Sequence, residues 1–172
     1  ALAEAFPQEI VAVVTGGGII SDTFSHLAFD KLVFTGSTNV SKTVMKAAAE
    51  NLVPVILELG GKSPVIVHPS INLKDVAERV VFGKLWNAGQ TCVAPDYIFI
   101  PRGKTTEFLR CFKAVVKSMY QALRDNQDYT YIINDRQNKR IKGYLEDALQ
   151  NGTHTTEINP ANEELDSVRK IA

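Results

Sequence analysis

The chain has 172 residues, of which 45% are hydrophobic and 22% are charged, a composition typical of a folded globular protein. Its 19 basic and 19 acidic residues leave no net charge, so nothing in the composition favours a nucleic acid partner. The apolar runs are too short to cross a bilayer, and the first ten residues lack the pattern of a signal peptide.

The chain contains only two cysteines, Cys92 and Cys111, too few for a disulfide framework and too far apart for a paired-cysteine metal site. Free thiols are typical of a reducing compartment, so we expect a cytoplasmic protein. The three histidines are scattered and have no ligand spacing. The sequence therefore predicts no metal site.

The first sixty residues alternate between two patterns. Short runs rich in Val, Ile and Phe predict buried strands at 9–16, 31–37 and 55–61. Between the last two runs, apolar residues recur at helical spacing, and Ser37 or Thr38 is suited to cap the helix that they predict. The predicted buried face consists of Val40, Val44, Ala47 and Ala48.

The second half continues the alternation. It predicts strands at 63–68 and 96–101, and helices at 72–89, 105–123 and 135–152. Alternating strands and helices indicate an α/β fold with a mostly parallel sheet, and the two glycines after the third strand suggest a boundary near 58–61. Both ends look internal to a longer chain, because no helix precedes the first strand and no stop signal follows the last segment.

The stretch FTGSTNVSK, residues 34–42, predicts a strand, a tight turn and the start of a helix. A helix N-terminus attracts anions, and Gly36 lets a ligand approach the backbone closely while Ser37 offers a hydroxyl. These residues could bind a phosphate or pyrophosphate. The motif is neither of the two common nucleotide-binding patterns, and many ordinary turns contain Gly-Ser.

The stretch LELGGKSP, residues 57–64, places Glu58 at the end of an apolar run. Burial of a carboxylate is costly unless the group is paired or protonated. One interpretation is a general base whose apolar surroundings favour the protonated form. The other is an edge position, or a salt bridge to Lys62.

The stretch NAGQTCVAPDY, residues 87–97, places Cys92 in a loop after a helix that Gly89 would end. Loops on a rigid scaffold often carry function, so Cys92 is a candidate nucleophile. The alternative is a packing residue, since cysteine is among the most buried residue types. Cys111 fits that alternative, because it lies in a predicted helix between Phe108 and Phe112.

The three stretches together resemble the aldehyde dehydrogenase superfamily. They occur in the family's order, with 22 residues between Gly36 and Glu58 and 34 between Glu58 and Cys92. AAAENLVPVILELGGKSP and GQTCVAPDY are most similar to the branch that includes coniferyl aldehyde dehydrogenase and the class 3 and fatty aldehyde enzymes. The resemblance covers nearly the whole chain.

The resemblance implies a partial Rossmann-like cofactor domain at 1–58, joined to a partial α/β catalytic domain at 59–172. It implies that Cys92 is the nucleophile, forming a thiohemiacetal and then a thioester, and that Glu58 activates the hydrolytic water. NAD or NADP is the implied cofactor, with contacts from Gly36, Ser37, Glu58 and Leu59. The implied substrate is an aromatic aldehyde such as coniferyl aldehyde, or a medium- or long-chain aliphatic one, and the implied assembly is a homo-oligomer.

Two departures from the family pattern limit these expectations. Ser41 stands where the family usually has glycine, which puts the affinity for the cofactor pyrophosphate in question. The family's oxyanion-hole asparagine and its second glutamate motif are not in this sequence. We therefore expect the chain alone to oxidise aldehydes poorly and to self-associate through exposed sheet edges.

Three other interpretations remain open. Cys92 could serve a cysteine acyltransferase or hydrolase that uses no cofactor, although no histidine is placed as its partner. The chain could be a structural domain without catalytic activity. It could also belong to a coenzyme A-acylating relative, although Glu58 favours hydrolysis to the acid.

Overall fold

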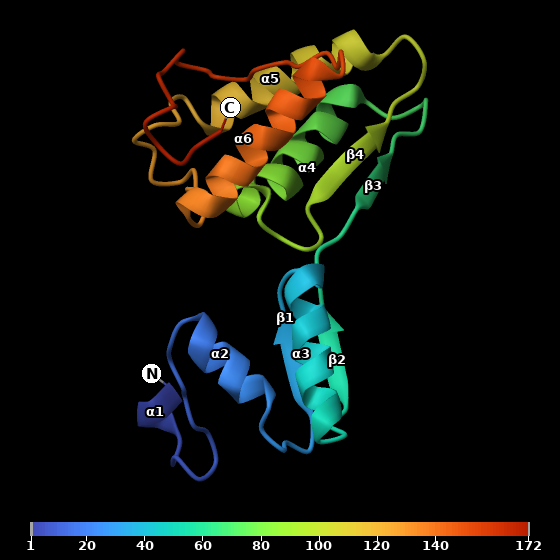
Figure 1. Ribbon diagram of the computed structural model, residues 1–172. Helices are drawn as coiled ribbons and strands as arrows, with labels where there is room; N and C mark the ends of the chain where they lie inside the picture. Colours follow the sequence, from blue (N-terminus) through green and yellow to red (C-terminus); the bar gives the residue numbers. More distant parts are fainter. Residues whose placement is uncertain (1, 172) are drawn as a thin grey trace. The chain divides into compact units, whose positions relative to one another are not determined.

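The computed structural model describes residues 2–171 and divides into two compact units, Ala1–Gly60 and Gly61–Ala172 (Figure 1). Each unit contains one sheet of two parallel strands. The predicted α/β class with parallel strand pairing is therefore confirmed, in the form of two small sheets.

The first unit is built around strands β1 (Leu32–Thr35) and β2 (Val55–Glu58), which helix α3 (Thr38–Glu50) connects. Ser37 caps α3, because its side-chain oxygen accepts the N–H of Val40 at 3.3 Å. Both strands and the Ser37 cap agree with the prediction from sequence. The core of the unit consists of Leu32, Val44, Ala48 and Val53, with Phe29, Phe34 and Val55 packed against them.

The buried face of α3 differs by one residue from the predicted face. Val40 is 50% exposed, whereas Ser41 is 2% exposed and lies on the same side as Val44. The Ser41 hydroxyl donates to the carbonyl of Thr38 at 2.8 Å, so its polar group is satisfied inside the helix. This local bond lets a serine occupy a core position.

The first thirty residues differ most from expectation. The predicted strand at 9–16 is wrong, and helices α1 (Leu2–Ala5) and α2 (Gly18–Ser25) lie on either side of an irregular segment. A strand needs a neighbouring backbone to hydrogen-bond with, and within residues 2–171 no strand pairs with this segment. Val13 and Val14 are consequently exposed.

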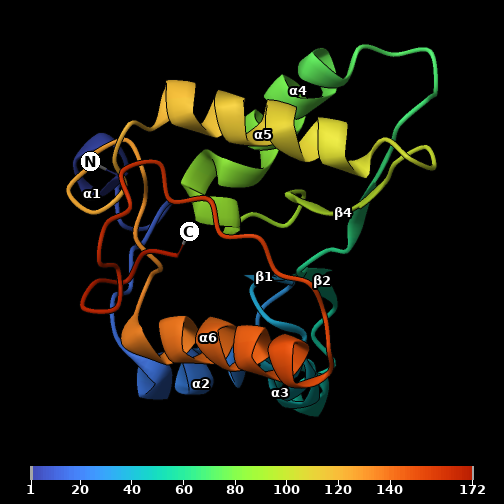
Figure 2. The same ribbon diagram turned by 90° about the horizontal axis from the view of Figure 1, so that it is seen from above.

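The second unit packs helices on the sheet formed by β3 (Ser63–Ile66) and β4 (Pro95–Phe99). Helix α4 (Leu73–Leu85) connects the strands and contacts β4, and α5 (Thr105–Met119) packs along α4 (Figure 2). Helix α6 (Asp135–Gln150) follows. These elements agree with the predicted ones. The core includes Val76, Val80, Val81, Phe108 and Val116.

Helix α4 ends four residues before the predicted Gly89. The short segment η1 (Trp86–Gly89) follows, in which Asn87, Ala88 and Gly89 all have positive φ, of 54°, 51° and 73°. A left-handed backbone cannot continue a right-handed helix, and it costs a residue other than glycine roughly 1–2 kcal/mol. The surrounding structure must therefore hold this turn in place.

An irregular segment, residues 120–134, packs on the core of the second unit. Its side chains Tyr120, Leu123, Tyr129 and Ile132 are all buried. The tail supplies hydrogen bonds to its backbone: Lys170 Nζ donates to the carbonyls of Leu123 and Asn126, each at 2.7 Å. Burial lowers the pKa of Lys170, while the charges of Asp125 and Glu163 act in the opposite direction.

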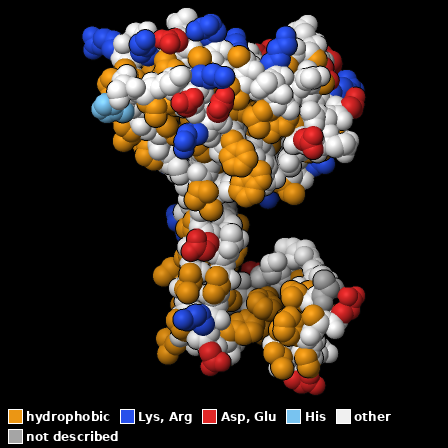
Figure 3. Space-filling model, turned by 180° about the vertical axis from the view of Figure 1, so that it is seen from behind, with side chains coloured by type: hydrophobic (Ala, Val, Ile, Leu, Met, Phe, Trp, Pro, Cys, Tyr) orange, Lys and Arg blue, Asp and Glu red, His pale blue; other side chains and the backbone are white. Residues whose placement is uncertain are grey.

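Both sheets leave paired apolar side chains exposed. Val33 lies opposite Ile56 in the first sheet, and Ile66 lies opposite Phe99 in the second, and all four are exposed. Hydrophobic side chains accordingly appear on the surface of both units (Figure 3). Among the described residues, no helix has both the length and the apolar content needed to cross a membrane.

Tyr129 generates a prediction about stability at high pH. Burial, with a smaller contribution from Tyr120, raises the pKa of Tyr129 to about 12, and its hydroxyl donates to the carbonyl of Ile171 at 2.8 Å. The folded chain favours the neutral phenol of Tyr129. The resulting contribution to the unfolding free energy is therefore fully present below about pH 10 and is lost as the pH rises toward 12.

We expect Tyr129→Phe to remove a pH-dependent loss of unfolding free energy of up to roughly 3 kcal/mol between about pH 10 and 12. Below that range the variant should be less stable by about 1 kcal/mol, because its hydrogen bond is lost. Urea unfolding as a function of pH measures both effects, with the exposed Tyr144→Phe as control. Parallel pH profiles for wild type and Tyr129→Phe would contradict the prediction.

Candidate functional site

Four of the predicted site residues lie at one edge of the first sheet. Thr35 pairs with Glu58 at the carboxyl ends of β1 and β2, and the N–H of Gly36 donates to the Glu58 carbonyl at 3.0 Å. Ser37 and Leu59 follow directly in the chain. Ligands of open α/β sheets bind at this edge, outside the carboxyl ends of the strands.

The start of α3 has the chemistry of an anion site. The amide groups of Thr38 and Asn39 lie in the first turn, where a helix offers N–H donors without internal acceptors. The helix dipole adds partial positive charge there. A Cβ atom on Gly36 would overlap the ring of Phe34, so the absence of a side chain at Gly36 lets this ring lie against the turn.

A cavity of about 710 Å³ lies in the same unit, a size within the usual range for ligand pockets. Val40, Thr43 and Val44 of α3 form part of its wall. The rest of the wall is largely apolar and includes Val11, Val13, Val14, Ile20, Phe24, Leu32 and Phe34. The start of α3, which is suited to an anion, and this apolar cavity thus lie in the same unit and share residues of α3.

Glu58 does not have the apolar surroundings expected from sequence. Side chains of β2 alternate between the two faces of the sheet, so Leu57 is half-buried and Glu58 is exposed. The alternative salt bridge to Lys62 is also wrong, because Lys62 pairs with Asp96 at 2.9 Å. The prediction of a desolvated Glu58 carboxylate was wrong because an apolar run in the sequence does not show which face of the sheet each residue occupies.

Cys92 lies in the second unit, in the turn between η1 and β4. Its thiol is free and its side chain is exposed, and the turn is closed by a bond from the Ala94 N–H to the Thr91 carbonyl at 3.1 Å. Cys111 is half-buried and packs against the core, which confirms its interpretation as a packing residue. The two thiols thus have different surroundings.

Gly61 and the Lys62–Asp96 ion pair hold the turn that carries Cys92, and sequence reasoning missed both. A Cβ atom on Gly61 would overlap the carbonyl oxygen of Cys92, whereas Gly60 has open space around it. Asp96 is the extra residue of a bulge, because Ser63 pairs with Pro95 but the next residue of β3 pairs with Tyr97. The LELGGKSP motif therefore supports the cysteine turn directly.

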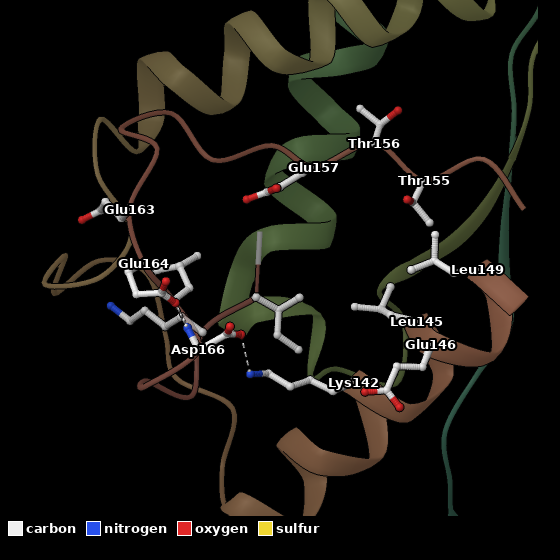
Figure 4. A pocket seen from close by; sticks show the side chains of 13 residues that line it. Lys142, Leu145, Glu146, Leu149, Thr155, Thr156, Glu157, Glu163, Glu164 and Asp166 are labelled. Atoms are coloured by element: carbon white, nitrogen blue, oxygen red, sulfur yellow. Dashed lines mark hydrogen bonds and ion pairs between the residues drawn. The ribbon is translucent and has the colours of Figure 1, made fainter.

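A separate hollow lies between α6 and the tail, where Lys142 pairs with Asp166 at 3.1 Å (Figure 4). Threonines, carboxylates and the three leucines Leu145, Leu149 and Leu165 line it. None of the predicted site residues is among its lining residues. Within residues 2–171, no group of three or more His, Cys, Asp or Glu side chains could hold a metal ion.

Comparison with known proteins identifies the family. The sequence model described as "Aldehyde dehydrogenase family" matches residues 1–165. The chain belongs to this family. This aldehyde dehydrogenase chain is 56% identical over 151 residues to a "Probable coniferyl aldehyde dehydrogenase" of Pseudomonas aeruginosa, covering 88% of the chain and 32% of that protein. It is 49% identical over 173 residues to a "Coniferyl aldehyde dehydrogenase" of a Pseudomonas species, covering 99% and 36%.

Solved structures of aldehyde dehydrogenases have the same fold. A substrate-bound AldH of Staphylococcus aureus superimposes with a TM-score of 0.84 at 38% identity, over 99% of this chain and 36% of that one. A Mycobacterium tuberculosis aldehyde dehydrogenase complexed with NAD+ gives 0.75 at 31% identity, over 86% and 31%. The chain spans about a third of the length of the curated relatives it matches.

The close approach of Gly61 to Cys92 predicts the effect of a substitution, and the neighbouring Gly60 provides a control. Gly61→Ala should destabilise the second unit by about 1–3 kcal/mol, because the methyl group displaces the Cys92 carbonyl. Gly60→Ala should change stability by less than about 0.5 kcal/mol, since it meets no atom. Urea unfolding of both variants measures the difference, and equal midpoints would contradict the assignment of Gly61 as a contact of the cysteine turn.

Proposed function

We propose that this chain contributes the nucleophile, the general base and part of the cofactor site of an NAD- or NADP-dependent enzyme that oxidises an aldehyde to a carboxylic acid. The observation that carries the proposal is the exposed Cys92 thiol, which follows the left-handed residues 87–89 and lies on a turn that Gly61 of the LELGGKSP motif supports. Strained backbone at an exposed reactive group is typical of functional sites. Family membership is consistent with this chemistry.

In the first step, the Cys92 thiolate adds to the aldehyde carbon. The carbonyl π bond becomes an oxyanion and the product is a thiohemiacetal. The backbone N–H of Cys92 is the donor that this chain offers to the oxyanion. Exposure of the thiol in the turn gives the aldehyde access to it.

The cofactor would be held by the first unit. The start of α3, with Gly36 and Ser37, suits the pyrophosphate, and Leu59 follows Glu58 at the same sheet edge. When bound, the nicotinamide supplies the two-electron acceptor that the oxidation of the thiohemiacetal to a thioester requires. Ser41 points into the core and not toward this edge, so the departure from glycine leaves the anion site open.

In the last step, Glu58 takes a proton from a water molecule that attacks the thioester carbonyl. The carbon–sulfur bond breaks, the carboxylic acid leaves, and the Cys92 thiolate is regenerated. The exposed position of Glu58 at the end of β2 leaves its carboxylate accessible to water.

The names of the relatives support a proposed substrate class. Three of them are named as coniferyl or probable coniferyl aldehyde dehydrogenases, so an aromatic aldehyde such as coniferyl aldehyde is the first candidate, and medium- or long-chain aliphatic aldehydes are the second. We further propose that residues 1–58 belong to the cofactor domain and 59–172 to the catalytic domain. The full-length protein would act as a homo-oligomer in the cytoplasm, where both thiols stay reduced.

The two cysteines provide a test of the nucleophile. In the full-length protein, Cys92→Ala should abolish aldehyde-dependent reduction of the cofactor, whereas Cys111→Ala should retain it within a few-fold. NADH or NADPH absorbance with coniferyl aldehyde and with an aliphatic aldehyde measures the rates. Unchanged turnover by Cys92→Ala would refute the proposed function.

Glu58→Gln tests the hydrolytic step separately. Formation of the thioester should persist, while its hydrolysis should slow by roughly 10²–10⁴-fold because the general base is gone. Pre-steady-state kinetics should therefore show one rapid equivalent of reduced cofactor per Cys92, followed by slow turnover. Equal slowing of the burst and the steady state would contradict this role for Glu58.

A further inference from the structure

Gln90, two residues before Cys92, forms hydrogen bonds with a distant part of the chain. Its side-chain Nε2 donates to the carbonyl of Tyr131 at 3.0 Å, and its Oε1 accepts the N–H of Ile133 at 2.9 Å. The carboxamide thus pairs with alternate residues of one extended backbone, as a neighbouring strand would do. Each bond joins residues more than 40 positions apart in the sequence.

Gln90 also closes the left-handed turn. The Gln90 N–H and its Nε2 both donate to the Asn87 carbonyl, at 3.0 Å and 3.1 Å, and Asn87 Nδ2 donates back to the Gln90 carbonyl at 3.2 Å. Asn87 is the first of the three residues with positive φ. One side chain therefore connects the strained turn to residues 131–133.

Residues 131–133 are in turn held from the tail. The N–H of Ile132 donates to the Arg169 carbonyl at 2.7 Å, and the Arg169 guanidinium donates to the Ile133 carbonyl at 2.6 Å. Ile132 is buried between these contacts. Because Gln90 and the tail take different groups of the same backbone, residues 131–133 form a fixed anchor and not a loose loop.

We propose that Gln90 is a positioning residue, whose carboxamide fastens the turn carrying Cys92 to the backbone of residues 131–133 and so fixes the place of the thiol. The effect of this positioning on catalysis rests on the proposed function of Cys92. Asn87 and Ala88 adopt a left-handed backbone at a cost, and the Gln90 side chain connects the Asn87 carbonyl to the backbone of residues 131–133.

The proposed role requires both the N–H donors and the oxygen acceptor of the Gln90 carboxamide. Glutamate has the same length and keeps the acceptor for the Ile133 N–H, but its carboxylate lacks the donors for Tyr131 and Asn87. Alanine keeps neither. Gln90→Glu therefore removes part of the hydrogen bonds to residues 131–133, and Gln90→Ala removes all of them. Gln121→Ala, at an exposed position after α5, is a control.

The test measures amide hydrogen exchange at Ile133 and Ala94 in the complete protein, together with alkylation of Cys92 by iodoacetamide. We expect Gln90→Ala to speed exchange at Ile133 by about tenfold or more, with Gln90→Glu in between and Gln121→Ala unchanged. The rate of alkylation of Cys92 should change by at least about threefold, while the rate for Cys111, an internal reference, stays constant. The turnover number should fall by at least about tenfold, with the Michaelis constant for the cofactor little changed.

Each outcome decides the proposal. Unchanged exchange at Ile133 in Gln90→Ala would show that the anchor does not exist. Faster exchange with unchanged Cys92 alkylation and turnover would show an anchor without a positioning role. If wild type lacks aldehyde oxidation, the proposed function fails, but exchange and alkylation still decide whether Gln90 fixes the thiol. Loss of the folded core, detected by circular dichroism, is separated from loss of the anchor by Gln90→Glu, whose length and volume match glutamine.

Discussion

The second unit depends on one constraint: an irregular segment lies against the core, and its backbone groups must find hydrogen bonds outside any helix or sheet. Residues 120–134 supply four buried side chains, so the segment cannot be withdrawn into solvent. A buried amide group without a partner there would cost free energy comparable to that of a lost hydrogen bond. Side chains from distant positions supply the bonds: Glu163 and Lys170 reach the more buried groups, and Gln90 and Arg169 reach exposed ones.

This constraint connects the fold to the candidate site. The groups that satisfy the segment also reach the turn before β4, because Gln90 belongs to that turn. Gly61 and the Lys62–Asp96 pair support the same turn from the side of β3. The turn that carries Cys92 thus has contacts with two separate stretches of chain, although the side chain of Cys92 is exposed.

Local sequence patterns predicted the regular elements well, because caps and apolar periodicity act over a few residues. Ser37 begins α3 as expected, and the helix through Phe108 packs on the core. Patterns failed where the answer depended on a remote partner. The run at 9–16 is apolar enough for a strand but lacks a neighbouring strand among the described residues.

The candidate site shows the same division. The motifs located Cys92 and Glu58, and the alternation of β2 then placed Glu58 on the exposed face. Gly89 indicated a helix end, but nothing local indicated that Asn87 and Ala88 would share its left-handed conformation. The partners of Gln90 lie 41 and 43 residues away, beyond any periodic pattern.

The long sequence separation of these contacts also has a consequence for biosynthesis. A chain leaves the ribosome from its N-terminus, so β3, α4 and β4 can assemble while the tail is still being made. Arg169 and Lys170 emerge late. They donate hydrogen bonds to the same irregular segment that Gln90 binds. The Cys92 thiol is therefore synthesised early, whereas the contacts of residues 131–133 with the tail form late, so the nascent chain carries an exposed cysteine without these contacts until translation has passed residue 170.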